Sequence, residues 1–117
     1  MTADLRRSLL ELHRLLLDHQ RRQVERISGR MSAAELLQAA TEDLRFSWIT
    51  ELFGPIAALD AAHHDGDEAA AERATEQLRA LLLEPDPEGG FGRRYLQVLQ
   101  EEPAVVLVHR DVTAALR

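Results

Sequence analysis

The longest one-sided hydrophobic pattern of the chain covers residues 4–28. Its apolar residues recur at steps of three and four, which at about 100° per residue places them on one wide helical face. On the opposite face three arginines each precede an acid by four residues, which predicts exposed ion pairs. We therefore expect one long amphipathic helix that ends at Gly29. The apolar face is Leu5, Leu9, Leu12, Leu16, Val24 and Ile27, with Leu10 and Leu17 at its edge, and the expected pairs are Arg7–Glu11, Arg14–Asp18 and Arg21–Glu25.

The next segment begins with a capping box at Ser32, which predicts a short helix through Ala40. Asp43 is expected to cap a third helix over about residues 44–64. Gly54-Pro55 lies in its middle, but the apolar period resumes in phase after the proline. The pattern therefore predicts a single helix with a kink at Pro55.

Three more helices are expected in the remaining sequence. One starts at Asp67 and ends near Leu82, before a Pro- and Gly-rich loop. A short one runs from Phe91 to about Glu101, and the last starts at Pro103. The apolar run at residues 105–108 is also compatible with a strand. However, the apolar positions around it continue with helical spacing, and no partner strand is predicted. The fold class predicted for residues 1–117 is one all-α domain, an antiparallel four-helix bundle with two additional short helices.

Composition restricts the chemistry available. The chain contains no cysteine, which excludes disulfides and thiolate metal sites. Every basic residue is arginine, a bias typical of GC-rich bacterial genomes, so no lysine can form a Schiff base. The opening residues lack an apolar signal core, and no stretch approaches about 20 apolar residues. We therefore expect a bacterial, cytoplasmic protein.

The net charge of −6 is unevenly distributed. Residues 1–30 carry more arginines than acids, whereas residues 31–90 are strongly acidic. These regions could complement one another within the fold or across a homodimer. A net acidic chain is a poor general binder of nucleic acid.

Two histidines occupy unusual positions. His13 lies near the centre of the first apolar face, and His109 lies between the valines of the last helix. They could form a core network, because a buried imidazole needs hydrogen-bond partners. They could instead be a metal or haem ligand pair, or include a general base. The polar residues expected near them are Gln20, Asp60, Arg94 and Tyr95.

A second polar cluster is Asp60-x-x-His63-His64-Asp65. An acid and a histidine three apart share a helical face, as in one half of a di-iron carboxylate site, but the second half is missing. The sequence therefore favours an exposed helix end, with its cations near the C-terminal dipole, as the explanation of the cluster. Trp48 and Tyr95 are expected to fill the interior of the bundle while their polar atoms form hydrogen bonds. Trp48 could instead be an exposed anchor that binds another protein.

Two patterns carry a family resemblance. They are Asp43-x-x-Phe46-x-Trp48-Ile49, and Phe91-x-x-Arg94-Tyr95-x-x-x-Leu99-Gln100-x-x-Pro103-x-Val105-Val106-x-x-His109. With Leu10-x-x-His13, they resemble a group of small uncharacterised bacterial all-helical proteins. The chain departs from that group at Leu44 and at His63-His64. The resemblance implies a domain of unassigned function, whose matching positions are His13, Trp48, Asp60, Arg94, Tyr95 and His109.

Three functions follow as expectations. The first is a non-catalytic helical protein that acts through protein contacts, as a homodimer or an accessory subunit. The second is a metal- or small-ligand-binding bundle that uses His13 and His109, joined by Asp60, Arg94 and Tyr95. The third is a small enzyme with the same residues as acid and base. No particular cofactor is indicated.

Overall fold

The computed structural model describes residues 2–117, and the regular structure in that range is entirely helical, as predicted. None of its helices is both long and apolar enough to cross a membrane. Residues 105–108 are helical, so the alternative of a strand there is wrong. The elements are α1 (Ala3–Ser28), α2 (Ala33–Glu42), the 3₁₀ turn η1 (Leu44–Phe46), α3 (Ser47–Asp65), α4 (Glu68–Leu82), α5 (Gly90–Glu101) and α6 (Pro103–Leu116).

Short polar and glycine residues set several of the helix boundaries. Gly29 ends α1 with φ 85°, a conformation that costs glycine little. The capping box at Ser32 is present at the start of α2, and the Asp67 side chain accepts from the backbone N–H of Ala70 to cap α4. Asp43 differs from the prediction. It caps η1 by accepting from Arg45 N–H, and α3 begins only at Ser47.

The third helix runs without interruption through Gly54 and Pro55. A residue before proline normally avoids helical geometry because its Cβ meets the proline ring. Gly54 has no Cβ and so removes that clash. The predicted single helix across this dipeptide is confirmed, and no chain reversal separates its two halves.

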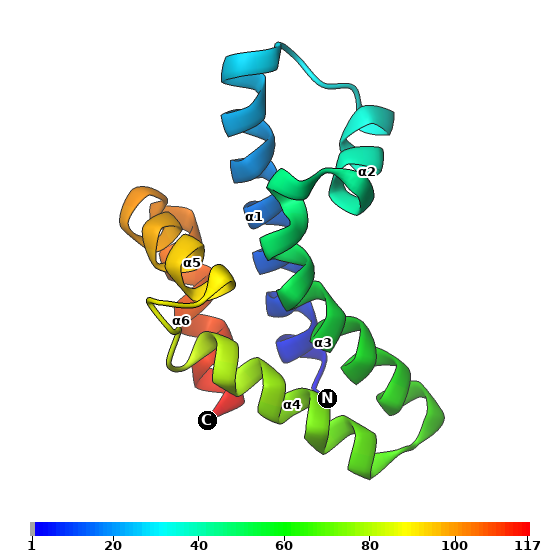
Figure 1. Cartoon of the computed structure of the whole chain (residues 1–117). Coiled ribbons are helices and arrows are strands. Elements are labelled where there is room, and N and C mark those ends of the chain that lie inside the picture. Colours follow the sequence, from blue (N-terminus) through cyan, green and yellow to red (C-terminus); the bar gives the residue numbers. More distant parts are fainter. Residues whose placement is uncertain (1) are drawn as a thin grey trace.

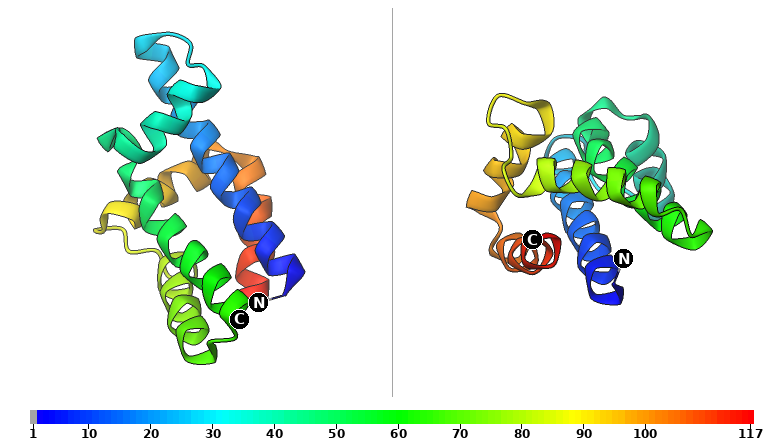
Figure 2. Two further views of the ribbon diagram at one scale, coloured as in Figure 1. Left: turned by 90° about the vertical axis from the view of Figure 1, so that its right-hand side faces the viewer. Right: turned by 90° about the horizontal axis from the view of Figure 1, so that it is seen from below.

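The helices pack in pairs, some between consecutive helices and some between helices distant in sequence. Helix α1 packs on α6 and α3, while α4 packs on α3 and α6. Both termini lie at the same end of the molecule, so α6 runs antiparallel to α1 (Figures 1 and 2). Helix α5 contacts α3 and α6, and α2 contacts α3. The C-terminal end of α1 extends with α2 beyond the other helices (Figure 1).

Burial follows the predicted faces over most of their length. Leu16 and Val112 are fully buried, each on its own apolar stripe. Ile27 is a correction, because it is 86% exposed although it shares the face of Leu16. The reason is its place at the projecting end of α1, where the face continues but the helices that cover it do not.

The ion pairs along α1 also differ from the prediction. Each arginine pairs with the acid three residues before it, not with the acid four residues after it. An acid on the N-terminal side of the cation agrees better with the helix dipole, which explains the choice. The observed pairs are Arg7–Asp4, Arg14–Glu11 and Arg21–Asp18.

Gly92 permits a close contact between α5 and the preceding loop. A Cβ at this position would lie 2.0 Å from the carbonyl oxygen of Asp86 and 2.6 Å from its nitrogen. Both are backbone atoms, which cannot move without moving the loop. The packing of α5 on this loop therefore requires glycine at position 92.

We predict that Gly92→Ala lowers the free energy of unfolding by about 1–3 kcal/mol, the usual cost of overpacking. The matched control is Gly90→Ala in the same helix, where a Cβ would lie 3.3 Å from the mobile Oε1 of Glu51. It should change stability by less than about 0.5 kcal/mol. Urea denaturation measures both variants, and equal midpoints would show that the loop does not depend on Gly92.

Candidate functional site

Tyr95 and His109 form the first hydrogen-bonded pair among the predicted residues. Tyr95 on α5 is fully buried, and its hydroxyl lies 2.7 Å from Nδ1 of the half-buried His109 on α6. Burial raises the pKa of the Tyr95 hydroxyl. Burial, with a smaller effect of Arg117, lowers the pKa of His109. The pair therefore joins a neutral phenol to a neutral imidazole at pH 7.

Aromatic contacts extend this pair toward α3. The ring of Tyr95 stacks on Phe91, with centroids 5.1 Å apart and planes inclined by 19°. Phe91 in turn meets Trp48, at 5.9 Å and 40°. These offset and tilted geometries are the favourable ones for aromatic pairs. One aromatic row thus connects α6, α5 and α3.

Trp48 ends the row with a hydrogen bond to α1. Its Nε1–H donates to Oε1 of Gln20 at 3.0 Å, and both side chains are buried. The interpretation of Trp48 as an exposed anchor is therefore wrong, because its indole is only 6% exposed. Gln20 was one of four polar residues expected near the core histidines, but its acceptor is used by the indole.

His13 has a different environment from the one predicted. It is half-buried, and its ring lies against Phe53 of α3, with centroids 4.7 Å apart. Burial lowers its pKa. No hydrogen bond to His13 occurs within residues 2–117, so the expected polar partner is absent there. His13 and His109 therefore contact different helices and do not form a pair with one another.

Asp60 and its neighbouring histidines lie at the exposed end of α3. Asp60 accepts from Arg6 of α1 at 2.9 Å, and this ion pair is half exposed. His63 and His64 are exposed. Across the described part of the chain, no three His, Asp or Glu residues are grouped so as to hold a metal ion.

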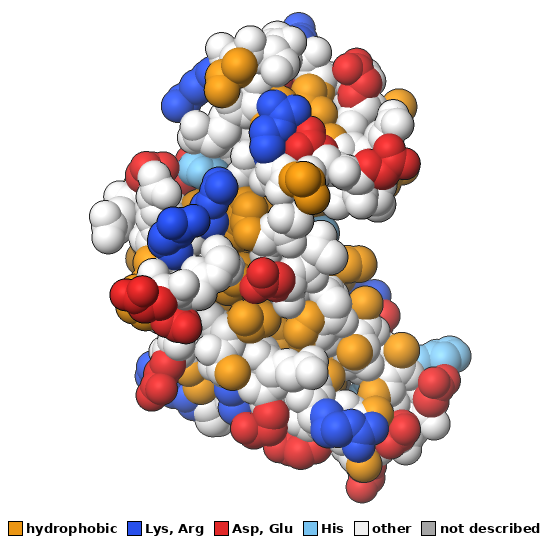
Figure 3. Space-filling view, in the orientation of Figure 1, with side chains coloured by type: hydrophobic (Ala, Val, Ile, Leu, Met, Phe, Trp, Pro, Cys, Tyr) orange, Lys and Arg blue, Asp and Glu red, His pale blue; other side chains and the backbone are white. Residues whose placement is uncertain are grey.

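A polar cleft of about 440 Å³ opens between α1 and α5. Three of the residues named from the sequence line it, namely Gln20, Trp48 and the exposed Arg94. On the face drawn in Figure 3, arginine side chains and one histidine lie beside acidic side chains where α5 approaches α1. The residues from α1 are His19, Gln20, Gln23 and Arg26, and those from α5 and its end are Arg94, Gln97, Val98, Glu101 and Glu102.

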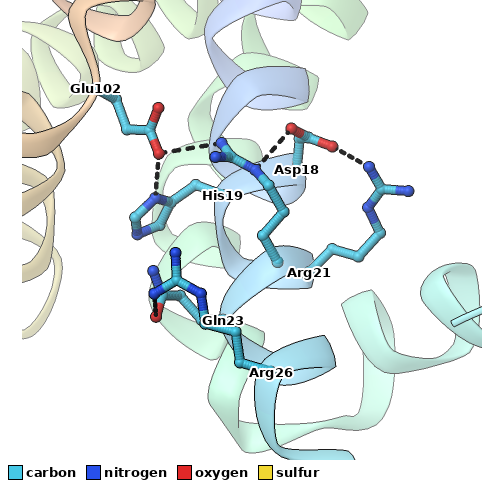
Figure 4. A network of polar contacts seen from close by, with 7 residues as sticks. Asp18, His19, Arg21, Gln23, Arg26 and Glu102 are labelled. Carbon is cyan, nitrogen blue, oxygen red and sulfur yellow. Dashed lines mark hydrogen bonds and ion pairs between the residues drawn. The ribbon is translucent and has the colours of Figure 1, made fainter. Parts of the chain in front are cut away.

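His19 and Glu102 anchor one wall of this cleft (Figure 4). Nδ1 of the buried His19 lies 3.0 Å from Oε1 of Glu102, which also forms an ion pair with Nη2 of Arg22 at 3.1 Å. Arg22 reaches on to Asp18 at 3.1 Å. The hydrogen bond from His19 and the charge of Arg22 lower the pKa of Glu102. Glu102 is thus a carboxylate that orients the imidazole.

Sequence reasoning missed His19 and Glu102. A signal existed for His19, because it lies three residues after Leu16 and so continues the buried face of α1. No comparable signal pairs it with Glu102, which is 83 residues away.

A second hollow, of about 650 Å³, lies between α1 and α3 and is mainly apolar. Leu10 and Phe53 line it and are 39% and 43% exposed. Ala57 and Ala61 of α3 continue the surface, with the Arg6–Asp60 ion pair beside them. We call this surface the α1–α3 groove. It combines an exposed aromatic ring with small neighbours, a combination common at contact surfaces.

Comparison of the chain with models of protein families, with curated proteins and with solved structures finds no match. Membership of the bacterial group that the sequence resembles stays a prediction.

Protonation of the two half-buried histidines should make stability depend on pH. Because burial lowers the pKa of His13 and His109, the unfolded chain binds more protons than the folded one below about pH 6.5. The free energy of unfolding should therefore be highest above about pH 6.5 and decrease as the pH drops toward about 5. Urea denaturation across this range measures how steeply the free energy of unfolding changes with pH.

The double variant His13→Gln, His109→Gln should flatten this slope, whereas His64→Gln, which alters an exposed ring, should leave it unchanged. A wild-type slope that survives in the double variant would assign the proton uptake to other groups. The carboxylates with lowered pKa titrate below this range.

Proposed function

We propose that this protein is a non-catalytic helical protein that self-associates through the α1–α3 groove. The observation that carries the proposal is the exposure of Leu10 and Phe53 side by side on a surface that small residues keep open. The sequence also lacks the phosphate-loop, nucleophile and zinc-protease motifs that would favour an enzyme.

The charges around the groove suit a second copy of the chain. On the α1 side the rim carries Arg6, with Arg7 and Arg14 on the adjoining surface. On the α3 side it carries Asp60 and Asp65. In a two-fold dimer, each α1 faces the α3 of the other copy, so each basic rim would meet an acidic one. This arrangement uses the uneven charge of the sequence, and the helix-in-groove mode supplies the apolar contact.

Sedimentation equilibrium tests this proposal. We predict that the wild-type protein is a dimer and that Phe53→Gln shifts it to monomer, because a polar side chain replaces the exposed ring at the centre of the contact. Leu44→Gln is the matched control, since Leu44 is 86% exposed and lies outside the groove. It should leave the dimer intact. A monomeric wild type, or equal effects of both substitutions, would contradict the proposal.

A metal- or small-ligand-binding function that uses His13 and His109 is the second candidate, with each imidazole acting in its own environment because the two do not form a pair. Its support is that burial lowers the pKa of both imidazoles, which keeps them neutral and able to coordinate at pH 7. Metal analysis of the purified protein, with its ultraviolet–visible spectrum, provides the test. We predict stoichiometric metal or a ligand-field or Soret band if this candidate is correct, and its loss in His109→Gln with the helical circular dichroism retained.

We also propose a more specific description of the fold. We infer that α1, α3, α4 and α6 act as an antiparallel four-helix bundle, because they pack in a closed series of neighbouring pairs. The bend expected at Pro55 would set the direction of the second half of α3, and with it the width of the groove.

A further inference from the structure

The polar cleft between α1 and α5 contains two buried side chains with polar atoms left over. His19 and Gln20 are each only 6% exposed, and both line the cleft. Each uses one polar atom for a partner inside the protein: His19 Nδ1 binds Glu102, and Gln20 Oε1 binds Trp48. No residue in the described range bonds His19 Nε2 or Gln20 Nε2. Arg21 Nε is the only fully buried side-chain nitrogen or oxygen without a hydrogen-bond partner in residues 2–117, so these two atoms must be open to the cleft, where a ligand or water can bond to them.

The two internal partners determine what these free atoms can do. The indole nitrogen of Trp48 can only donate, so Gln20 must turn its oxygen toward Trp48 and its amide N–H₂ toward the cleft. The Glu102 carboxylate can only accept, so His19 Nδ1 carries the hydrogen. In the neutral ring Nε2 is then an acceptor. The cleft therefore presents a donor next to an acceptor, both in fixed orientation.

The charges of the cleft favour an anion. Arg26 and Arg94 line it, and neither forms an ion pair within residues 2–117. Two acids also border the cleft, but Glu102 is neutralised by Arg22 and by its bond from His19. Glu101 remains and binds the Gln97 amide at 3.4 Å. Two arginines against one free acid leave the cleft with a net positive charge.

We propose that the cleft binds a small polyhydroxylated carboxylate, the class to which uronic acids belong. The arginine fork matches a carboxylate. A hydroxyl both donates and accepts, which suits the adjacent His19 and Gln20 atoms, and the Gln23 and Gln97 amides offer further contacts of the same kind. The volume of about 440 Å³ lies in the range of small-molecule sites. This site shares no residue with the α1–α3 groove.

Three probe molecules separate the parts of this proposal. Glucuronate carries both the carboxylate and the hydroxyls, glucose lacks the charge, and cyclohexanecarboxylate lacks the hydroxyls. In titrations followed by amide chemical shifts, glucuronate should saturate a set of signals from α1 and α5. The other two should bind at least roughly tenfold more weakly, since each loses one class of contact. Equal binding of all three, or no saturable shift with glucuronate, would overturn the proposal.

Two neighbouring arginines provide matched variants. Arg94→Gln should weaken glucuronate binding by roughly tenfold, whereas Arg93→Gln, also exposed but outside the cleft, should leave it unchanged. Gln20→Glu preserves an acceptor for Trp48 but turns a negative oxygen toward the ligand, so it should abolish binding. Tryptophan fluorescence and circular dichroism verify that the fold persists. Equal effects at Arg93 and Arg94, or unimpaired binding in a folded Gln20→Glu variant, would contradict the assignment.

Discussion

One row of contacting side chains crosses the interior and joins four helices. It starts at Gln20 on α1, passes through Trp48 on α3 and the stacked rings of α5, and ends at His109 on α6. The hydrogen bond at the Gln20 end is buried, and the one at the His109 end is partly buried. Losing Gln20 or His109 would leave the buried polar group of Trp48 or Tyr95 without its partner, at a cost of about 1–3 kcal/mol. The row therefore fixes how α5, a short helix, sits against the other three.

The polar cleft depends on the α1 end of this row. Trp48 determines which way the Gln20 amide faces, and the adjacent His19 is oriented by Glu102, at the junction of α5 and α6. The loop before α5 must lie directly on Gly92 for that helix to occupy its position. Packing in the interior and polarity in the cleft are thus consequences of the same placement of α5.

The periodicity of the sequence was sufficient to predict the helices, but not to predict how far other helices cover each apolar face. The step of three and four residues identified the buried side of α1 correctly as far as Val24, because other helices cover it there. It failed at Ile27, where the same side faces solvent, because periodicity defines a face without defining how far its cover extends. The helix caps at Ser32 and Asp67 were predicted correctly, because a cap depends only on residues close in sequence.

The candidate residues show the same limit. Tyr95 was one of four polar residues expected near the two histidines, and it is hydrogen-bonded to His109. The partner of Trp48 was not predicted, because it lies 28 residues away on another helix. His13 was expected to need a hydrogen bond, but partial exposure lets its ring pack on Phe53 instead. The need for a partner applies only where burial is complete, and sequence alone does not give the degree of burial.

A structural role alone does not account for the residue at position 20. A buried indole needs one acceptor, which a backbone carbonyl or a hydroxyl supplies equally well. Glutamine supplies that acceptor together with an amide nitrogen, and this nitrogen faces the cleft without a protein partner in the described range. A group that served only to satisfy Trp48 would need no such donor on the cleft side. An acceptor group of the ligand that we propose for the cleft would use this amide nitrogen.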